Sequence, residues 1–369
     1  MDVRSWCQEN SAEVRVLEQA TKALIALPKV VGSPPYRLEA GAPDVPAIYL
    51  ATIPNGTVIG GSSLVLTANG VGLSDEIALS DGNYYAQRLG PLKKLSNGQA
   101  KAVLAPPAGV TISEAITLCK GGASNYFHWL IECLPKLEVV DAFPELNNVP
   151  IIIDDGLPKQ LVDALKMIDK NKRPLLTIEK NRPAVVGSLY VVSDLSIFND
   201  NYDNPVRIDD IVISPRAAKF VRKRLARAPS GIRRKFYLSR SKASYRKIRN
   251  NDVIQSYLEG LGFETVNPDE MSFDEQLDLF SQAGEIVGAS GAALANMLFA
   301  PADCRVTCLV SNNSQSNLYF YSSIANYIGL QFQYVLGPEI KGTASRKYAV
   351  HNDFSIPLDR LQEALEWGR

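Results

Sequence analysis

The sequence predicts an α/β protein of two Rossmann-like domains, with a β-hairpin region near its N-terminus. Apolar residues make up 46% of the 369-residue chain, which is enough to fill two domain cores. Apolar runs typical of strands alternate with amphipathic runs typical of helices in two successive series, and such alternation indicates parallel sheets. The polar, turn-rich segment 198–207 separates the two series, so we expect a linker there.

The first domain is expected to span residues 1–200. Residues 11–27 carry apolar residues at helical spacing and predict one short helix. Between residues 46 and 105, short alternating runs are interrupted by Asn55-Gly56 and Asn69-Gly70, the pair that tight β-turns favour. This pattern predicts antiparallel hairpins. Strand and helix patterns then alternate: strand 111–119, helix 125–143, strand 149–154, helix 158–168, and strands near residues 175 and 189.

The second domain is expected to span residues 208–340. Its strand patterns lie at 235–240, 263–268, 285–289, 305–310 and 332–337, and its helical patterns at 251–262, 272–283, 291–299 and 318–328. This order predicts a doubly wound sheet, which binds ligands beyond the carboxyl ends of its strands. The tail, 341–369, has Leu358, Leu361, Leu365 and Trp367 on one helical side, and we expect it to pack back on the first domain.

The charge of the chain argues against a nucleic-acid partner. Lysine plus arginine and aspartate plus glutamate each total 39, so no general attraction to polyanions is expected. One segment, 211–251, nevertheless holds 14 lysines and arginines and no acidic residue. A basic RNA-binding face would carry exposed aromatic residues, whereas Phe236 and Tyr237 fall inside a predicted strand.

The cysteines and the apolar runs indicate a cytoplasmic protein. The five cysteines include no CxxC pair and are accompanied by only two histidines, so we expect reduced thiols and no metal site. Residues 1–16 lack the basic start and apolar run of a secretory signal. No apolar run reaches the roughly 18 residues of a membrane span, which leaves peripheral association with a membrane surface as an option.

The first candidate motif is the strand-to-helix junction 287–296. Its small residues Ser290, Gly291 and Ala292 would let a phosphate approach the backbone amides at a helix start. The alternative is a tight turn that packs a helix on the sheet. The motif is not GxGxxG, and no acidic residue follows at the spacing of a dinucleotide site, so a nicotinamide-dependent dehydrogenase is disfavoured.

The second candidate motif follows the first strand of the second domain. Ser239-Arg240 and Arg246 lie at the carboxyl edge of the sheet, where a guanidinium group could bind a phosphate through two hydrogen bonds. The alternative is a solvated basic loop.

The third candidate motif is the start of the helix at 125–143. His128 and Glu132 are four residues apart and so share one face, with Asn125 one turn earlier. The alternative is a histidine with a structural hydrogen bond, although this one follows a Gly-Gly-Ala-Ser loop at a sheet edge.

In order and spacing, the three motifs resemble glycosyltransferase family 61, which includes many bacterial polysaccharide-synthesis proteins. The resemblance covers roughly residues 112–310. It implies a GT-B fold whose two domains face a cleft, an inverting transfer, an acceptor side in the first domain and a nucleotide-sugar site in the second. The donor would be a substrate, UDP-type by preference, with a glycan acceptor and no cofactor. The family pattern matches Asn125, His128, Glu132, Ser239, Arg240, Arg246, Asn250, Gln276, Gly291, Leu294 and Asn296.

Two positions depart from the family pattern. Ser290 stands where many members have histidine, and Asn251 where an acidic residue is common. Serine could still donate a hydrogen bond to phosphate but adds no positive charge, so the departure leaves donor identity open.

The resemblance suggests roles for individual residues. We expect His128 or Glu132 to act as base, and Arg240, Arg246 and the amides of 290–292 to stabilise the departing diphosphate. Glu270 follows a strand and could bind the ribose or base, beside a capping box of Ser272 and Glu275. No DxD triplet occurs, so we expect no metal requirement.

Two other functions stay open. One is another polysaccharide-modifying enzyme, such as a pyruvyltransferase. The second is a non-catalytic subunit that binds a nucleotide or sugar, which the serine at position 290 permits.

Overall fold

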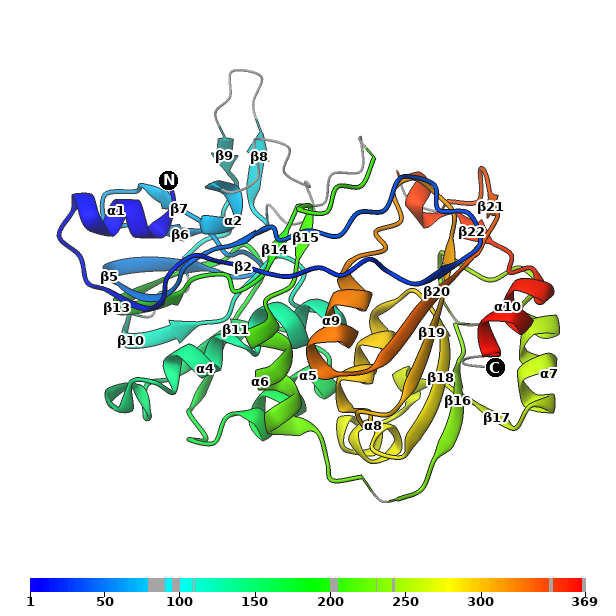
Figure 1. The fold of residues 1–369 in the computed structure, drawn as a ribbon. Helices are drawn as coiled ribbons and strands as arrows, with labels where there is room; N and C mark the ends of the chain where they lie inside the picture. The colour runs from blue at the N-terminus through cyan, green and yellow to red at the C-terminus, as the bar shows by residue number, and fades with distance from the viewer. Residues whose placement is uncertain are drawn as a thin grey trace. The chain divides into compact units, whose positions relative to one another are not determined.

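The computed structural model describes residues 1–78, 90–94, 100–107, 109, 111–199, 205–229, 231–240, 243–344 and 348–366. The chain forms two compact units: unit 1 contains Met1–Lys22 and Asp44–Asn201, and unit 2 contains Ala23–Pro43 and Tyr202–Arg369. Each unit is a mixed α/β structure whose main sheet contains parallel strands flanked by helices, so the predicted α/β class is confirmed (Figure 1). The middle of the predicted linker, 200–204, falls outside the described residues.

Unit 1 is built on an eight-stranded sheet with the order β12-β11-β10-β13-β5-β6-β7, to which β1 adds by pairing with β5. Four of its strands are parallel: β10 (Thr111–Thr117), β11 (Ile151–Asp154), β12 (Leu175–Ile178) and β13 (Pro183–Val192). The antiparallel strands are β1 (Val14–Glu18), β5 (Ile48–Ile59), β6 (Val65–Leu66) and β7 (Gly72–Leu73). The parallel strands therefore form one half of the sheet.

The helices of unit 1 are mostly short. They are α1 (Val3–Glu9), α2 (Asp75–Ala78), α3 (Tyr126–His128), the π-helix η1 (Trp129–Cys133), α4 (Lys136–Val140), the 3-10 helix η2 (Pro144–Leu146) and α5 (Lys159–Ile168). The remaining short strands are β2 (Thr21–Lys22), β4 (Asp44–Val45), β8 (Leu92–Lys94), β9 (Ala100–Ala102) and β14 (Ile197–Phe198).

Two expectations for the N-terminal region are wrong. The predicted helix at 11–27 is instead β1 and β2, because Val14 and its neighbours pair antiparallel with β5. Asn55-Gly56 lies inside β5 and makes no hairpin turn. A Cβ on Gly56 would lie 3.0 Å from Leu189 Cδ2, so this glycine serves close sheet packing. Asn69-Gly70 does lie in the turn between β6 and β7, where Gly70 has φ 77°.

Unit 2 contains a six-stranded sheet with the order β17-β16-β18-β19-β20-β3, and all of its strand pairs are parallel. The strands are β3 (Val30–Val31), β16 (Arg234–Leu238), β17 (Phe263–Val266), β18 (Ala283–Ala289), β19 (Arg305–Ser311) and β20 (Gln331–Gly337). Short strands β15 (Ile211–Val212), β21 (Glu339–Ile340) and β22 (Asp353–Phe354) lie outside this sheet.

Helices cover both faces of the unit 2 sheet (Figure 1). They are α6 (Pro215–Leu225), α7 (Asn251–Gly260), η3 (Pro268–Glu270), α8 (Phe273–Phe280), η4 (Ala292–Phe299), α9 (Phe320–Ile328), η5 (Ala349–His351) and α10 (Leu358–Leu365). Tyr237 packs with α7 and α10, whereas its neighbour Phe236 faces Phe280 of α8. The helix predicted at 291–299 is a 3-10 helix, η4.

Two segments belong to a different unit from the one predicted. Residues 23–43 belong to unit 2, because β3 pairs with β20 through Val30 and Tyr334. The tail also belongs to unit 2, where Leu361 and Ala364 are buried in the core, whereas the prediction assigned its packing to the first domain. Trp367 lies outside the described residues.

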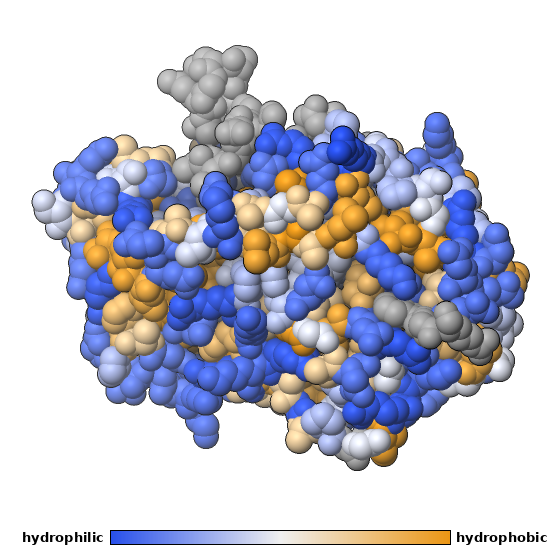
Figure 2. Space-filling model, in the orientation of Figure 1, coloured by the Kyte–Doolittle hydropathy of each residue, from blue (hydrophilic) through white to orange (hydrophobic). Residues whose placement is uncertain are grey.

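The face of the molecule in Figure 2 is largely hydrophilic, with apolar areas dispersed among charged residues. Within the described ranges, no helix combines the length and apolar character needed to cross a membrane.

Candidate functional site

The unit 2 sheet reverses its strand order beside β16. The chain passes from β16 to β17 on one side and returns to β18 on the other. Such a reversal opens a crevice beyond the carboxyl ends of the two central strands, where ligands of doubly wound sheets bind. Ser239 and Arg240 follow β16, and Ser290 and Gly291 follow β18. Two of the predicted motifs therefore meet at this edge.

Arg240 and Gly291 lie in direct contact. A Cβ built on Gly291 would fall 1.7 Å from Arg240 Nη1, so any larger residue would displace the guanidinium group. The Gly291 carbonyl also accepts a hydrogen bond from the Tyr321 hydroxyl at 2.6 Å. The absence of a side chain at Gly291 thus leaves the space that the Arg240 guanidinium group occupies.

Arg246 lies beside Arg240 on the same loop. Both guanidinium groups approach the Tyr245 ring, at 5.9 Å for Arg240 and 5.2 Å for Arg246. Arg246 has φ 54°, a left-handed conformation that non-glycine residues adopt at a cost. Its backbone N–H donates to the His351 carbonyl at 3.3 Å, which holds the loop in this conformation.

The two arginines form a positively charged site, and among the described residues the charge of Asp269 offsets part of it without an ion pair to Arg240. Burial, and then the charge of Arg246, lower the pKa of Arg240 to about 10. The Nε atoms of both arginines are buried and without a hydrogen-bond partner. Within the described chain, no carboxylate lies within 4.0 Å of either guanidinium group. Both arginines are half-buried, and a partly desolvated cation without an ion-pair partner is unfavourable, so this arrangement favours binding of an anion.

One of the predicted phosphate-binding amides is already engaged. The Ser290 N–H donates to the Leu309 carbonyl at 2.8 Å, so in this structure it is used in sheet pairing, whereas the prediction gave it to a phosphate. The backbone of β18 continues in sheet pairing up to this point. The amides of Gly291 and Ala292 stay as candidates.

Gln276 and Asn296 form a buried pair of amides. Asn296 Nδ2 donates to Gln276 Oε1 at 2.9 Å, and Gln276 Nε2 donates to the Pro268 carbonyl at 3.0 Å. Both side chains are buried, 3% and 0% exposed respectively. They connect α8, η3 and η4, so their role is to hold these helices in place.

The other predicted residues of unit 2 lie around the same loops. The Asn250 side chain donates to the Ile356 carbonyl at 2.7 Å and accepts from the Ile356 N–H at 3.0 Å. These two bonds fix the end of the loop to the segment before α10. Glu270 is exposed at the end of η3, and the Ser239 N–H donates to the Val266 carbonyl. The capping box of Ser272 and Glu275 is confirmed.

In unit 1, the third motif forms the start of a helix that changes type. Asn125 caps α3, because its Oδ1 accepts from the N–H groups of Phe127 at 2.9 Å and His128 at 3.4 Å. Its side chain therefore has a structural role. The next turn is the π-helix η1, a form often found at functional sites.

His128 and Glu132 face each other, as their spacing predicted. His128 Nδ1 contacts Glu132 Oε1, with the His128 side chain 23% exposed and that of Glu132 only 2%. A carboxylate on Nδ1 favours the tautomer with its proton there, so Nε2 becomes the proton acceptor. The Phe198 ring lies edge-on to the imidazole at 5.4 Å and limits its rotation.

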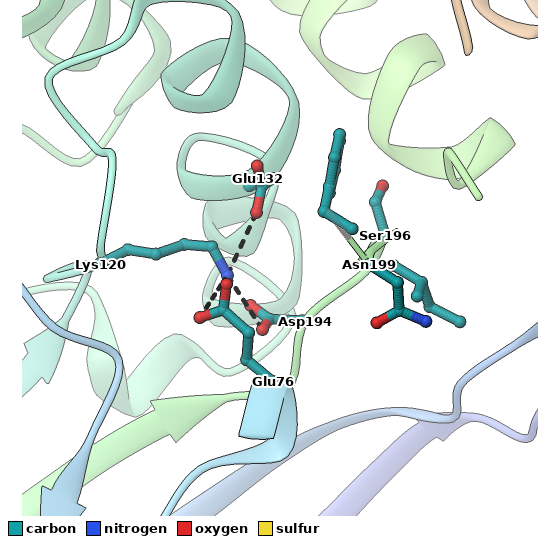
Figure 3. Close-up of a pocket in the computed structure, with 8 residues that line it drawn as sticks. Glu76, Lys120, Glu132, Asp194, Ser196 and Asn199 are labelled. Atoms are coloured by element: carbon teal, nitrogen blue, oxygen red, sulfur yellow. Dashed lines mark hydrogen bonds and ion pairs between the residues drawn. The ribbon is translucent and has the colours of Figure 1, made fainter. Parts of the chain in front are cut away.

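The structure adds a buried cluster of charged residues that the motif search missed. Lys120 Nζ lies 3.0 Å from Asp194 Oδ2, 3.1 Å from Glu132 Oε2 and 3.3 Å from Glu76 Oε2 (Figure 3). Lys120 and Asp194 follow the neighbouring parallel strands β10 and β13. Their positions just after two predicted strands could have pointed to them in the sequence. Glu76, on α2, carried no such signal.

The lysines of this cluster control the ionisation of Asp194. Burial alone would raise the pKa of this carboxyl, but the charges of Lys120 and Lys136 outweigh it and hold the pKa below its usual value. Lys136 Nζ contacts Asp194 Oδ1 at 2.8 Å. A small pocket beside the cluster is lined by Glu76, Lys120, Glu132, Asp194, Ser196, Ile197, Phe198 and Asn199.

In comparison with known families, residues 126–307 match the family model described as Glycosyltransferase 61. The match begins one residue after Asn125 and includes His128, Arg240 and Gly291, so the resemblance found in the sequence is confirmed. A search of curated proteins finds no match. Among the residues with described positions, no group of three or more His, Cys, Asp or Glu side chains is arranged to hold a metal ion.

Proposed function

Because residues 126–307 form a glycosyltransferase family 61 domain, we propose that this protein is an inverting glycosyltransferase of polysaccharide biosynthesis. It moves a sugar from a nucleotide-sugar donor, UDP-type by preference, to a glycan or related acceptor. The units act as the two domains of a GT-B enzyme, with the donor on unit 2 and the base on unit 1. The observation that carries this proposal is the pair of arginines at the switch point of the unit 2 sheet, which have no carboxylate partner in the described structure.

The donor diphosphate binds to Arg240 and Arg246. Two guanidinium groups match the charge of a diphosphate, and each donates parallel hydrogen bonds to its oxygens. As the bond from the anomeric carbon to the diphosphate breaks, negative charge develops on the leaving oxygen and the arginines stabilise it. The two guanidinium groups neutralise the charge of the departing diphosphate, as a metal ion does in other transferases. We therefore expect full activity in EDTA.

His128 accepts the proton of the acceptor hydroxyl. The acceptor oxygen forms the new bond to the anomeric carbon while its proton passes to His128 Nε2, and the nucleoside diphosphate departs. Glu132 is the weaker candidate for the base because its side chain is 2% exposed and its oxygens contact His128 and Lys120. Its role is to orient the imidazole.

A thermal-shift experiment with nucleoside diphosphates tests the donor site. A ligand that binds only the folded protein stabilises it, by about 2.7 kcal/mol at a hundred times its Kd, and so raises Tm. We expect UDP or a related diphosphate to raise Tm of the unmodified protein. Arg240→Met should abolish this increase, whereas Arg37→Met, at a side chain 90% exposed, should retain it. If no nucleoside diphosphate raised Tm, the proposal would fail.

A non-catalytic, nucleotide-binding subunit is the second candidate function. The departure at Ser290, where many family members have histidine, favours it. In that case nucleotide would raise Tm, but mass spectrometry would detect no glycosylated product across a panel of acceptors and donors.

A further inference from the structure

Lys120 is the central cation of the buried cluster in unit 1. Its side chain is 2% exposed, and its ammonium group contacts carboxylates from three separate segments of the chain. In Figure 3 the Glu76, Glu132 and Asp194 carboxylates converge on its Nζ. A lysine buried to this extent is rare unless it is paired, so these contacts hold its ammonium group in place.

Glu132 connects Lys120 to His128. Its Oε2 lies 3.1 Å from Lys120 Nζ, and its Oε1 contacts His128 Nδ1. An ionised carboxylate accepts hydrogen bonds at both oxygens, so with Lys120 present Glu132 receives one proton donor on each side. His128 must then donate from Nδ1, which leaves Nε2 able to accept a proton.

We propose that Lys120 is a positioning residue that keeps Glu132 ionised and thereby holds His128 in the tautomer with a basic Nε2. This inference rests on the proposed function, because it concerns the base that glycosyl transfer requires. It adds a residue that lies before the family match, which begins at residue 126.

Replacement of Lys120 by an uncharged residue would remove the central positive charge of the cluster. Without it, three carboxylates would lie close together in a buried site, and such a group takes up a proton. Glu132 is the least exposed of the three, at 2% of its side chain. A protonated Glu132 would donate to His128 Nδ1 and shift the ring proton to Nε2, which removes the base.

Charged groups from several segments surround Glu132 and Lys120, and Asp154 accepts a hydrogen bond from the Lys120 backbone N–H at 3.4 Å. Lys120 approaches Glu132 from the loop after β10, and Glu76 and Asp194 contact Lys120 from α2 and from the segment after β13. Lys136 lies one contact further away, on Asp194 Oδ1. On the same helix, burial and the neighbouring charge of Glu132 raise the pKa of Cys133, which stays a neutral thiol.

Nitrogen-15 NMR of the imidazole rings tests the proposal directly. The chain has two histidines, so His128→Gln identifies the signals of His128. At a pH where the ring is neutral, we expect a protonated Nδ1 and an unprotonated Nε2 in the unmodified protein. In Lys120→Met the two nitrogen resonances should exchange positions. Lys136→Met is the matched control, because Lys136 contacts Asp194 and not Glu132 among the described groups, and it should keep the original pattern.

Circular dichroism shows whether Lys120→Met folds. If it does not fold, a second variant, Lys120→Gln, is used. In Lys120→Gln the amide still donates hydrogen bonds to the carboxylates but carries no charge, so we expect the same exchange of resonances. The proposal is overturned by a protonated Nε2 in the unmodified protein, or by an unchanged pattern in a folded Lys120 variant. These spectra need no substrate, so they separate this inference from a failure to detect transferase activity.

Discussion

Arg240 depends on the missing side chain of Gly291 for its position. Gly291 has φ 177°, an extended conformation open to every residue, so backbone freedom does not explain this glycine. The explanation is space: its Cβ position lies 1.7 Å from Arg240 Nη1. A single steric requirement therefore links two segments that are 51 residues apart in the sequence.

Gly291→Ala tests this requirement. The added methyl group should push the Arg240 guanidinium out of the switch point and weaken nucleoside diphosphate binding by about 10- to 100-fold, the loss of one hydrogen-bonded charge contact. Calorimetric titration measures the change. Gly260→Ala is the control, because nothing lies within 4 Å of a Cβ at that position, and its affinity should match that of the unmodified protein. Equal affinities for both variants would disprove the steric argument.

His128 and Glu132 should act as one unit. We expect His128→Ala to lower kcat by about 10²- to 10⁴-fold, which is the usual contribution of a general base. Glu132→Gln should also lower kcat, because an amide no longer fixes the proton on Nδ1. Single-turnover rates with a proven donor and acceptor provide the measurement, and Glu145→Gln on the exposed surface should leave them unchanged. A near-normal rate in His128→Ala would rule out this base.

The loop that carries the arginines is supported by a distant part of the chain. Between β16 and α7, the Lys247 N–H donates to Asp353 Oδ1 at 2.8 Å, and Arg249 forms an ion pair with the same carboxylate at 2.7 Å. Asn250 adds two hydrogen bonds to the Ile356 backbone. The family pattern includes Asn250, and these bonds show that its side chain supports the site from the side of the tail.

Asn250→Ala should destabilise the protein. It leaves the N–H and C=O of Ile356 without their side-chain partners, which costs about 1–3 kcal/mol for partly buried groups. Urea denaturation would show this as a lower midpoint with the same slope. Asn326→Ala, at an exposed position of α9, should change stability by less than about 0.5 kcal/mol. If the two variants had the same midpoint, the tail would contribute nothing to the stability of the loop.

The reactivity of the five cysteine thiols can be used to detect local unfolding in either unit. All are free and buried, with Cys7, Cys119 and Cys133 in unit 1 and Cys304 and Cys308 in unit 2. Burial, with nearby carboxylates, raises the pKa of Cys7 to about 11 and that of Cys304 to about 12. Their reactive thiolate forms are therefore scarce at neutral pH.

Thiol labelling with DTNB should be slow in the native protein. At about pH 8, close to the pKa of an ordinary thiol, a raised pKa keeps these groups protonated and burial excludes the reagent. We expect all five thiols to react after denaturation. Because the pKa values are raised, native labelling should increase as the pH rises toward them. Rapid reaction of native thiols at about pH 8 would contradict the burial described for these residues.

Much of the geometry of the candidate site could be predicted from the sequence because it depends on local spacing. The four-residue interval from His128 to Glu132 places them on one helix face whatever surrounds the helix. Arg240 and Gly291 each follow a strand, and the alternation of strands and helices predicted a parallel sheet whose carboxyl ends share an edge. The capping box of Ser272 and Glu275 is equally local.

Contacts between residues far apart in the sequence decided the features that local patterns did not predict. The apolar spacing of residues 11–27 suits a helix, yet β5 offers a strand partner that makes β1. Likewise, the tail joins unit 2 because Leu361 and Ala364 find their apolar contacts there. Lys120, Glu76 and Asp194 come from separate segments, and their attraction arises only when the folded sheet edge removes water from between them. Local periodicity holds no information about such partners, because it reaches a few residues while these contacts span many.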